Sequence, residues 1–250
     1  MSSVKPNTIA WVITGGGAHL RECVSVLEYV KKRFGLKVTL FLTKWGYEVS
    51  RIFGVLPRLR SISPGGYYEE FLVGDEGMYY VGRVNVGRYK ALIIAPATAN
   101  TIAKMVYGVA DTVATALFAQ AGKSSIPTIV LPTDIPNEEG YVVTETPCYV
   151  DRAVCSTANC NACQLISQCP AKAIEVVDNL PRINLSKCIG CALCEKICPK
   201  AVKCWEKIKL APRSIDLENI NKLTKMEGVI VVKNPWEIAE KIEVVLSSSW

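Results

Sequence analysis

Residues 91–104, ALIIAPATANTIAK, carry the clearest sequence pattern for the fold class. The run ALIIA at Ala91–Ala95 is wholly apolar, which is typical of a strand buried on both faces of a sheet. Helical spacing follows at 99–107. Similar strands and helices alternate along the chain, at Thr8–Thr14, Leu20–Phe34, Lys37–Thr43, 46–55, 111–121 and 128–131. This alternation predicts an α/β fold, a flavodoxin-like or Rossmann-like open parallel sheet with helices on both faces.

The alternation is interrupted by a cysteine-rich segment and then resumes. GVIVV at 228–232 reads as another strand, followed by a last helix. One strand and one helix make a poor domain alone, so we expect them to return to the first sheet. We therefore predict a discontinuous sheet domain, residues 1–147 and 207–250, with a small α+β module inserted at 148–206. Residues 56–88 are expected to be irregular, with a hairpin near 74–77.

The cysteines are unevenly distributed. The chain has 11 among 250 residues, of which Cys23 stands alone and ten fall between Cys148 and Cys204. The sequence has neither an apolar run long enough to span a membrane nor a signal-peptide segment in its first residues. We expect a cytoplasmic protein, in which such clustering favours thiolate ligands for metal and not disulfides.

The segment 188–199, CIGCALCEKICP, has the spacing C-x2-C-x2-C-x3-C-P. An upstream run, 155–170, repeats it more loosely as C-x4-C-x2-C-x5-C-P, and similar phrases, AKAIEVV and KAVKCW, follow the two runs. This duplication resembles the bacterial-type ferredoxins that carry two 4Fe–4S clusters. The alternative is a zinc ribbon built from two CxxC pairs, but zinc needs only four ligands, whereas eight are present in phase.

The ferredoxin resemblance implies the ligands, because the fourth cysteine of each run there binds the other cluster. One cluster would be held by Cys155, Cys160, Cys163 and Cys198, and the other by Cys188, Cys191, Cys194 and Cys169. The widened first run departs from the pattern and leaves a three-iron cluster open at the first site. Cys148 and Cys204 have no place in this scheme, and Cys23 is interpreted as a small core residue.

Three glycines, Gly15, Gly16 and Gly17, lie between the first strand and the first helix. This position favours phosphate binding at a helix N-terminus. The dinucleotide fingerprint G-x-G-x-x-G/A is not met, because Leu20 stands at its third position, and the second strand ends in Thr43-Lys44 without an acidic residue. NAD binding is therefore disfavoured.

The segment PATANTIAK, with YGVADTVAT and residues 213–232, resembles the homo-oligomeric flavin-containing Cys decarboxylase superfamily. Its members include phosphopantothenoylcysteine decarboxylases, flavin prenyltransferases and archaeal flavoproteins related to dihydromethanopterin reductase. The resemblance covers most of residues 8–134 and 213–246. It implies FMN across the carboxyl ends of the strands, contacted by Gly15, Gly16, Gly17, Thr43, Thr98, Asn100 and Thr101. The alternative is that Thr98 and its neighbours only cap a helix.

The chain departs from the decarboxylases of that superfamily. His19, its single histidine, lies inside the glycine loop and not on a separate catalytic segment. We interpret it as a contact to the flavin phosphate or ribityl chain, or as a simple helix-start residue. Pro132-Thr133-Asp134 stands where decarboxylases carry a PAMN-like substrate clasp. A decarboxylase or prenyltransferase activity is therefore disfavoured, and no catalytic side chain is assigned.

Clusters pass single electrons, whereas flavin can deliver a hydride. The combination predicts an iron–sulfur flavoprotein oxidoreductase that passes electrons from 4Fe–4S clusters to FMN, and then as hydride to a dihydropterin such as dihydromethanopterin. The alternative is an FMN and iron–sulfur electron-transfer protein that serves a partner protein without a small substrate. An external donor such as a ferredoxin is expected, and the resemblance implies a homo-oligomer built on trimers.

The formal charge of +6 first suggests a polyanionic partner. Two oxidised clusters with their thiolates carry about −2 each, and the FMN phosphate about −2 more. Together they cancel the excess of lysine and arginine. We therefore expect neither a nucleic-acid nor a membrane partner.

Overall fold

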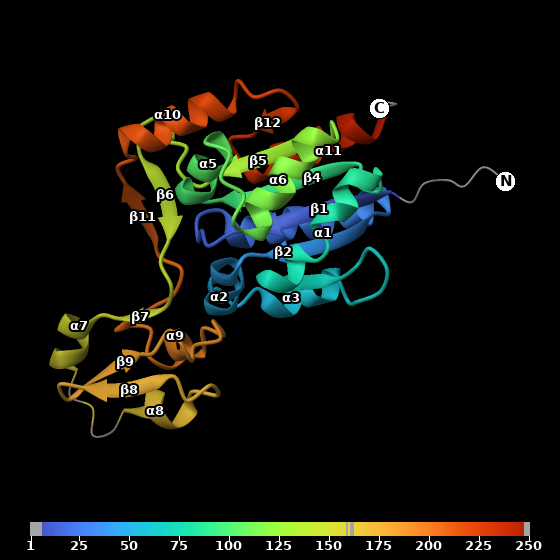
Figure 1. The fold of residues 1–250 in the computed structure, drawn as a ribbon. Coiled ribbons are helices and arrows are strands. Elements are labelled where there is room, and N and C mark those ends of the chain that lie inside the picture. Colours follow the sequence, from blue (N-terminus) through green and yellow to red (C-terminus); the bar gives the residue numbers. More distant parts are fainter. Residues whose placement is uncertain (1–6, 159, 161–162, 248–250) are drawn as a thin grey trace.

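The computed structural model describes residues 7–158, 160 and 163–247. Its main element is a six-stranded sheet in the order β12-β5-β4-β1-β2-β3, in which every pair is parallel. The strands are β1 (Thr8–Ile13), β2 (Lys37–Leu42), β3 (Phe71–Val73), β4 (Ala91–Ala97), β5 (Thr128–Pro132) and β12 (Val229–Val231). The predicted open parallel α/β sheet is confirmed, and β12 does return to it beside β5 (Figure 1).

Helices cover both faces of this sheet because side chains alternate along its strands. Ile9, Trp11 and Ile13 of β1 pack on one face with α1 (Leu20–Phe34) and α11 (Pro235–Ser247). The intervening residues, Ala10 and Val12, belong to the core of the other face. That face is covered by α5 (Ala99–Val106), α6 (Val113–Lys123) and α10 (Ser214–Leu223). The free thiol of Cys23 is 1% exposed in the first core, in agreement with its interpretation as a packing residue.

Residues 56–88 are more regular than the sequence predicts. After α2 (Lys44–Ile52) comes a second helix, α3 (Leu56–Ile62), with Pro57 in its first turn. A proline is tolerated there because the first backbone N–H groups of a helix have no partner within it. β3, a helical turn α4 (Asp75–Met78) and a 3₁₀ segment η1 (Val81–Val86) follow. The expected hairpin near 74–77 is wrong, since α4 occupies it.

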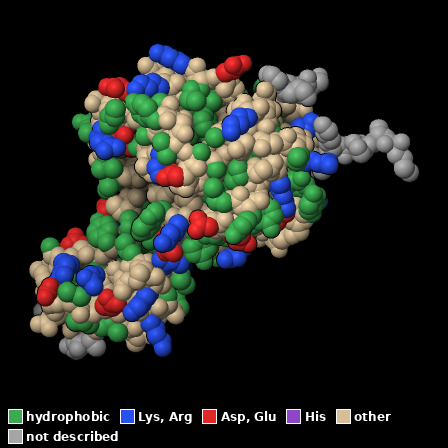
Figure 2. Space-filling model, viewed as in Figure 1, with side chains coloured by type: hydrophobic (Ala, Val, Ile, Leu, Met, Phe, Trp, Pro, Cys, Tyr) green, Lys and Arg blue, Asp and Glu red, His purple; other side chains and the backbone are tan. Residues whose placement is uncertain are grey.

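The cysteine-rich segment forms a smaller lobe beside the sheet (Figure 1). Two antiparallel ribbons lead into it: β6 (Val142–Glu145) pairs with β11 (Lys207–Leu210), and β7 (Tyr149–Val150) with β10 (Val202–Lys203). The lobe itself carries α7 (Arg152–Thr157), α8 (Gln164–Gln168), the hairpin β8 (Ile174–Val177) with β9 (Leu180–Ile183), and α9 (Leu193–Ile197). Figure 2 shows hydrophobic side chains gathered where the lobe meets the rest of the molecule. Within the described residues, no helix has the length and apolar character to cross a membrane.

One cysteine pair corrects the expectation that no thiol enters a disulfide. Cys148 and Cys204 are bonded between the two ribbons, with their Cα atoms 3.9 Å apart. Cys148 precedes β7 and Cys204 follows β10, so the antiparallel pairing of these two strands brings the cysteines together. Fifty-six positions separate them in sequence, and spacing alone therefore gave no signal.

Candidate functional site

The glycine loop lies at the carboxyl end of β1, between the strand and α1. In the part of the chain that the structure describes, the backbone N–H groups of Gly15, Gly16 and Gly17 donate no hydrogen bond to other residues. The loop is tightly surrounded: a Cβ on Gly15 would lie 2.8 Å from the Cβ of Trp45, and one on Gly16 would lie 2.5 Å from Cγ2 of Thr133. Free amides in a compact loop before a helix are suited to an anionic group such as a phosphate.

Thr98 connects β4 to the loop. Its backbone N–H donates to Oγ1 of Thr14 (2.9 Å), the residue before Gly15, and Thr14 Oγ1 donates to the carbonyl of Pro96 (2.7 Å). The Thr98 hydroxyl caps α5 and lies 3.0 Å from the hydroxyl of Thr101, which is 6% exposed. Asn100 is exposed beside them. Thr101 is therefore a buried partner of the cap, whereas Thr98 and Asn100 stay at the edge of the sheet.

Two further strands end at the same edge. The backbone N–H of Thr43 donates to the carbonyl of Ile13 (3.0 Å), and its hydroxyl caps α2 by accepting from Gly46 N (2.9 Å). Thr133 follows β5 and donates through its backbone N–H to Ala97 O (2.9 Å). The carboxyl ends of β1, β2, β4 and β5 thus bring the glycine loop, Thr43, Thr98 and Thr133 together. Parallel sheets bind ligands at this edge.

Trp45 is a site residue that the sequence patterns do not predict. It is 68% exposed, an unusual position for the largest side chain, and it lies beside Gly15. Its signal in the sequence was its place two residues after Thr43, at the end of a predicted strand. A flat indole at this edge can cover a ring system such as an isoalloxazine.

His19 lies where the loop enters α1 and adopts a left-handed backbone with φ 62°. Its side chain makes no capping hydrogen bond. Burial lowers the pKa of His19, and Lys207 acts in the same direction while Glu22 opposes it. The imidazole is therefore neutral near pH 7, and a neighbouring anion would favour its protonation.

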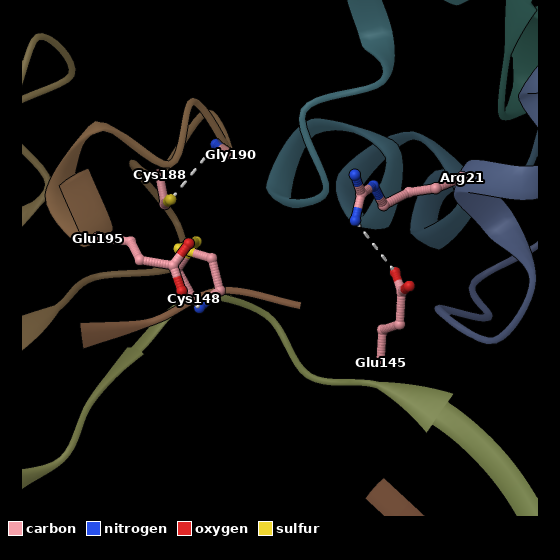
Figure 3. Close-up of a disulfide and its surroundings, with 7 residues drawn as sticks. Arg21, Glu145, Cys148, Cys188, Gly190 and Glu195 are labelled. Carbon is pink, nitrogen blue, oxygen red and sulfur yellow. Dashed lines mark hydrogen bonds and ion pairs between the residues drawn. A yellow bond between two sulfur atoms is a disulfide. The ribbon is translucent and has the colours of Figure 1, made fainter. Parts of the chain in front are cut away.

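The ribbon β6–β11 approaches the loop from the cysteine lobe. A Cβ on Gly17 would lie 3.5 Å from the carbonyl oxygen of Glu145, and the Glu145 carboxylate pairs with Arg21 at 3.7 Å (Figure 3). The Arg21 guanidinium also stacks 4.0 Å from the ring centroid of Trp205. Arg21 therefore links α1 to β6 through Glu145, and to the segment between β10 and β11 through Trp205, near the glycine loop.

The cysteines of the lobe form two neighbourhoods. Burial raises the pKa of Cys155, and the nearby thiols of Cys163, Cys198 and Cys160 raise it further. Cys198 comes from the second run, so residues of both runs meet here.

The second neighbourhood contains three cysteines of the second run and one of the first. Burial raises the pKa of Cys188, with further contributions from Cys191 and from Cys169 of the first run. Burial also raises the pKa of Cys194 to about 11, and the nearby thiols of Cys188 and Cys191 act in the same direction. These four cysteines line one small apolar cavity. Thiols in such surroundings are ligands for a soft metal centre once they lose their protons.

The spacing of the thiols matters for the kind of metal. Four thiolates on one zinc ion lie about 3.8 Å apart, because each Zn–S bond is about 2.3 Å. Among the described residues, the group of three or more ligand atoms within 4.8 Å of one another consists of Cys148, Cys194 and Cys204. Neither four-thiol neighbourhood is among the groups of this compactness, so the described thiols are not gathered as closely as the four ligands of one zinc ion.

A larger cavity of about 470 Å³ lies elsewhere, between α5, α6 and the start of β12. It is lined by apolar residues that include Met105, Phe118 and Met226. It opens at the amino ends of β5 and β12, away from the glycine loop. It is therefore no part of the site at the carboxyl edge.

Comparison with known proteins agrees with both parts of the chain. A family model described as "Flavoprotein" matches residues 2–137, and one described as "4Fe-4S binding domain" matches residues 181–202. A relative from Methanocaldococcus jannaschii named dihydromethanopterin reductase (acceptor) is 42% identical over 237 residues, which cover 93% of this chain and 94% of the relative. One of the same name from Methanosarcina mazei is 35% identical over 237 residues, covering 93% and 97%.

The fold is also similar to a solved structure. Burkholderia xenovorans DmrB in complex with FMN, described as a cubic protein cage for redox transfer, has a TM-score of 0.61 at 24% identity. The likeness covers 98% of this chain and 97% of that one. At this identity it establishes a shared fold.

Proposed function

Because the chain belongs to the flavoprotein family and carries a 4Fe–4S binding region, we propose that it is an iron–sulfur flavoprotein oxidoreductase acting on a dihydropterin. When bound, the iron–sulfur clusters supply single electrons, and FMN supplies a hydride to a substrate such as dihydromethanopterin. The substrate follows from the two relatives named dihydromethanopterin reductase (acceptor), which align with nearly the whole chain.

The observation that carries the flavin assignment is the convergence of four strand ends on a loop with free amides. The N–H groups of Gly15–Gly17 would hold the phosphate, and His19 would lie beside it. Thr43, Thr98 and Asn100 would contact the rest of FMN, while Thr101 supports Thr98 through its hydroxyl. Trp45 would cover the ring system and exclude water from it.

We propose two clusters, each held by the four cysteines of one thiol neighbourhood. Cys155, Cys160, Cys163 and Cys198 hold one, and Cys169, Cys188, Cys191 and Cys194 hold the other. Residues 148–206 constitute the cluster domain, and residues 1–147 with 207–250 constitute the FMN domain. An external one-electron donor such as a ferredoxin would load the clusters. The chain would assemble into a homo-oligomer built on trimers.

The test is anaerobic purification followed by cofactor counting and turnover. We expect one FMN and eight iron atoms per chain, and consumption of dihydromethanopterin when a low-potential reductant is supplied. A protein that holds all of these cofactors but leaves dihydromethanopterin unchanged would overturn the substrate assignment, and would favour electron transfer to a partner protein. Purified protein without flavin would overturn both candidate functions, because the reductase and the electron-transfer protein both require bound FMN.

A further inference from the structure

The disulfide between Cys148 and Cys204 occupies the point where the cysteine lobe joins the rest of the chain. It lies between the ribbon β6–β11 on one side and the ribbon β7–β10 on the other. Cys148 is 2% exposed and belongs to the core of the lobe with Cys188 and Val202. Figure 3 shows Cys148 close to Cys188 and Glu195, on the lobe side of the junction.

A third sulfur lies against this disulfide. The Sγ atoms of Cys148, Cys194 and Cys204 all lie within 4.8 Å of one another. Cys194 belongs to the run 188–198 that we propose as cluster ligands. The following residue, Glu195, accepts a hydrogen bond from the backbone N–H of Cys204 (3.0 Å), which fixes α9 against the disulfide. Both sulfur atoms of the disulfide therefore lie within 4.8 Å of the sulfur of one predicted ligand of the second cluster.

Burial limits how this disulfide can react. Thiol–disulfide exchange requires a thiolate to reach a sulfur atom, and the burial of Cys148 leaves only the half-buried Cys204 open to such an approach. Electron transfer needs no such approach, and its rate falls steeply with distance. A metal centre bound through Cys194 would be the nearest source of electrons.

We propose that Cys148 and Cys204 form a redox-active disulfide that takes up two electrons through the iron–sulfur cluster held by Cys194. This inference rests on the proposed function, because it requires a cluster at that position. A low-potential one-electron donor delivers two electrons in succession. The S–S bond breaks, each sulfur takes one proton from solvent, and two thiols result. In the reverse reaction the two thiols release two protons to solvent and pass two electrons, one at a time, through the cluster as the S–S bond forms. The pair thus adds a two-electron store beside a one-electron carrier.

Anaerobic reductive titration of the cofactor-loaded protein tests this directly. Wild type should accept two more electrons per chain than the variant Cys148→Ser/Cys204→Ser at equal iron and flavin content. The control Cys23→Ala, which removes a buried thiol of the sheet core, should accept as many electrons as wild type. Equal electron counts for wild type and the double variant would overturn the proposal.

A second measurement does not depend on the folding of the variant. Wild-type samples taken before and after reduction are quenched in acid, alkylated, then reduced and alkylated with a heavier reagent. The heavy label should mark Cys148 and Cys204 in the oxidised protein and the light label in the reduced protein. The same light label in both samples, or the heavy label in both, would contradict the proposal. Iron and flavin are quantified separately, so a protein without clusters would indicate failure of the proposed function instead.

Discussion

The backbone of Gly54 meets the backbone of Gly190. A Cβ on Gly54 would lie 2.3 Å from the carbonyl oxygen of Gly190, and both residues have a positive φ, +69° and +63°. Gly54 follows α2 at the sheet domain, whereas Gly190 lies between two proposed cluster ligands. The cysteine lobe is thus held against the sheet domain by a backbone contact that leaves no room for a side chain.

Gly54→Ala should separate the lobe from the sheet domain, because the new methyl group overlaps backbone and not a flexible side chain. Electron transfer from the clusters to the flavin should slow by about tenfold or more. The rate is measured by stopped-flow spectroscopy as the loss of flavin absorbance. Gly87→Ala is the matched control, since its φ of +62° carries the same strain of about 1 kcal/mol in open space. Equal rates in both variants would show that the contact has no such role.

Arg51→Lys should loosen the same junction by removing hydrogen bonds between the sheet domain and the cysteine lobe. The Arg51 guanidinium donates to the carbonyl of Cys188 and, at 3.0 Å, to that of Leu185. A lysine keeps the charge but cannot make both bonds in this fork geometry. Losing one charged hydrogen bond of about 1.5–3 kcal/mol should speed local opening at least tenfold, measured as amide hydrogen exchange at residues 186–190. Arg33→Lys, at an exposed position, should leave that exchange unchanged.

Gly16→Ala should impair FMN binding by displacing Thr133 from the loop, since the added Cβ would lie 2.5 Å from Cγ2 of Thr133. Thr133→Ser removes that methyl group, so the double variant should regain most of the affinity. Flavin fluorescence quenching measures the dissociation constants, with a rise of about tenfold expected for the single variant, as an overpacking cost of about 1–3 kcal/mol implies. A double variant as weak as Gly16→Ala would argue against this contact as the cause.

FMN affinity should depend on the protonation of His19. Burial holds the pKa of His19 below its usual value in the free protein, and an adjacent phosphate would raise it. The bound state then takes up a proton, so affinity rises as pH falls through the bound-state pKa, and it levels off below the free-state pKa. The gain is about tenfold for each unit of pKa difference.

His19→Gln is the comparison that isolates this effect. Ionisation of the FMN phosphate is common to both proteins and cancels in the ratio of their dissociation constants between pH 5 and 8. A ratio independent of pH would place His19 away from the phosphate.

Cys169→Ser should remove the cluster whose other ligands, Cys188, Cys191 and Cys194, come from the second cysteine run. Cys169 belongs to the first run in sequence, but its thiol neighbours Cys188. The variant should lose the paramagnetic signal of the cluster bound by 188–194 and keep that of the cluster bound by 155–163. Cys198→Ser should show the opposite pattern, because Cys198 neighbours Cys155. Electron paramagnetic resonance with iron analysis distinguishes the two, and loss of the same cluster in both variants would contradict the grouping.

Local patterns were enough to predict much of this molecule. The apolar run at 91–95 and the helical spacing of Leu20–Phe34 gave the strands and helices of the sheet, because both follow from short-range periodicity. The spacing of Cys188, Cys191 and Cys194 indicated an iron–sulfur region for the same reason. Residues 56–88 were harder, since α3 and β3 are short and are stabilised by their packing on β2 and α1 and not by their own sequence.

Local sequence patterns thus predict the parallel α/β sheet, the glycine loop at a strand end and the duplicated cysteine runs. Other features are visible only in the folded chain: Thr133 and Trp45 lie beside the glycine loop, Gly54 meets Gly190, and Cys148 bonds to Cys204 next to Cys194. Each of these contacts joins residues from distant parts of the chain. Their proximity depends on strand order and on where the inserted lobe docks, which no local pattern encodes.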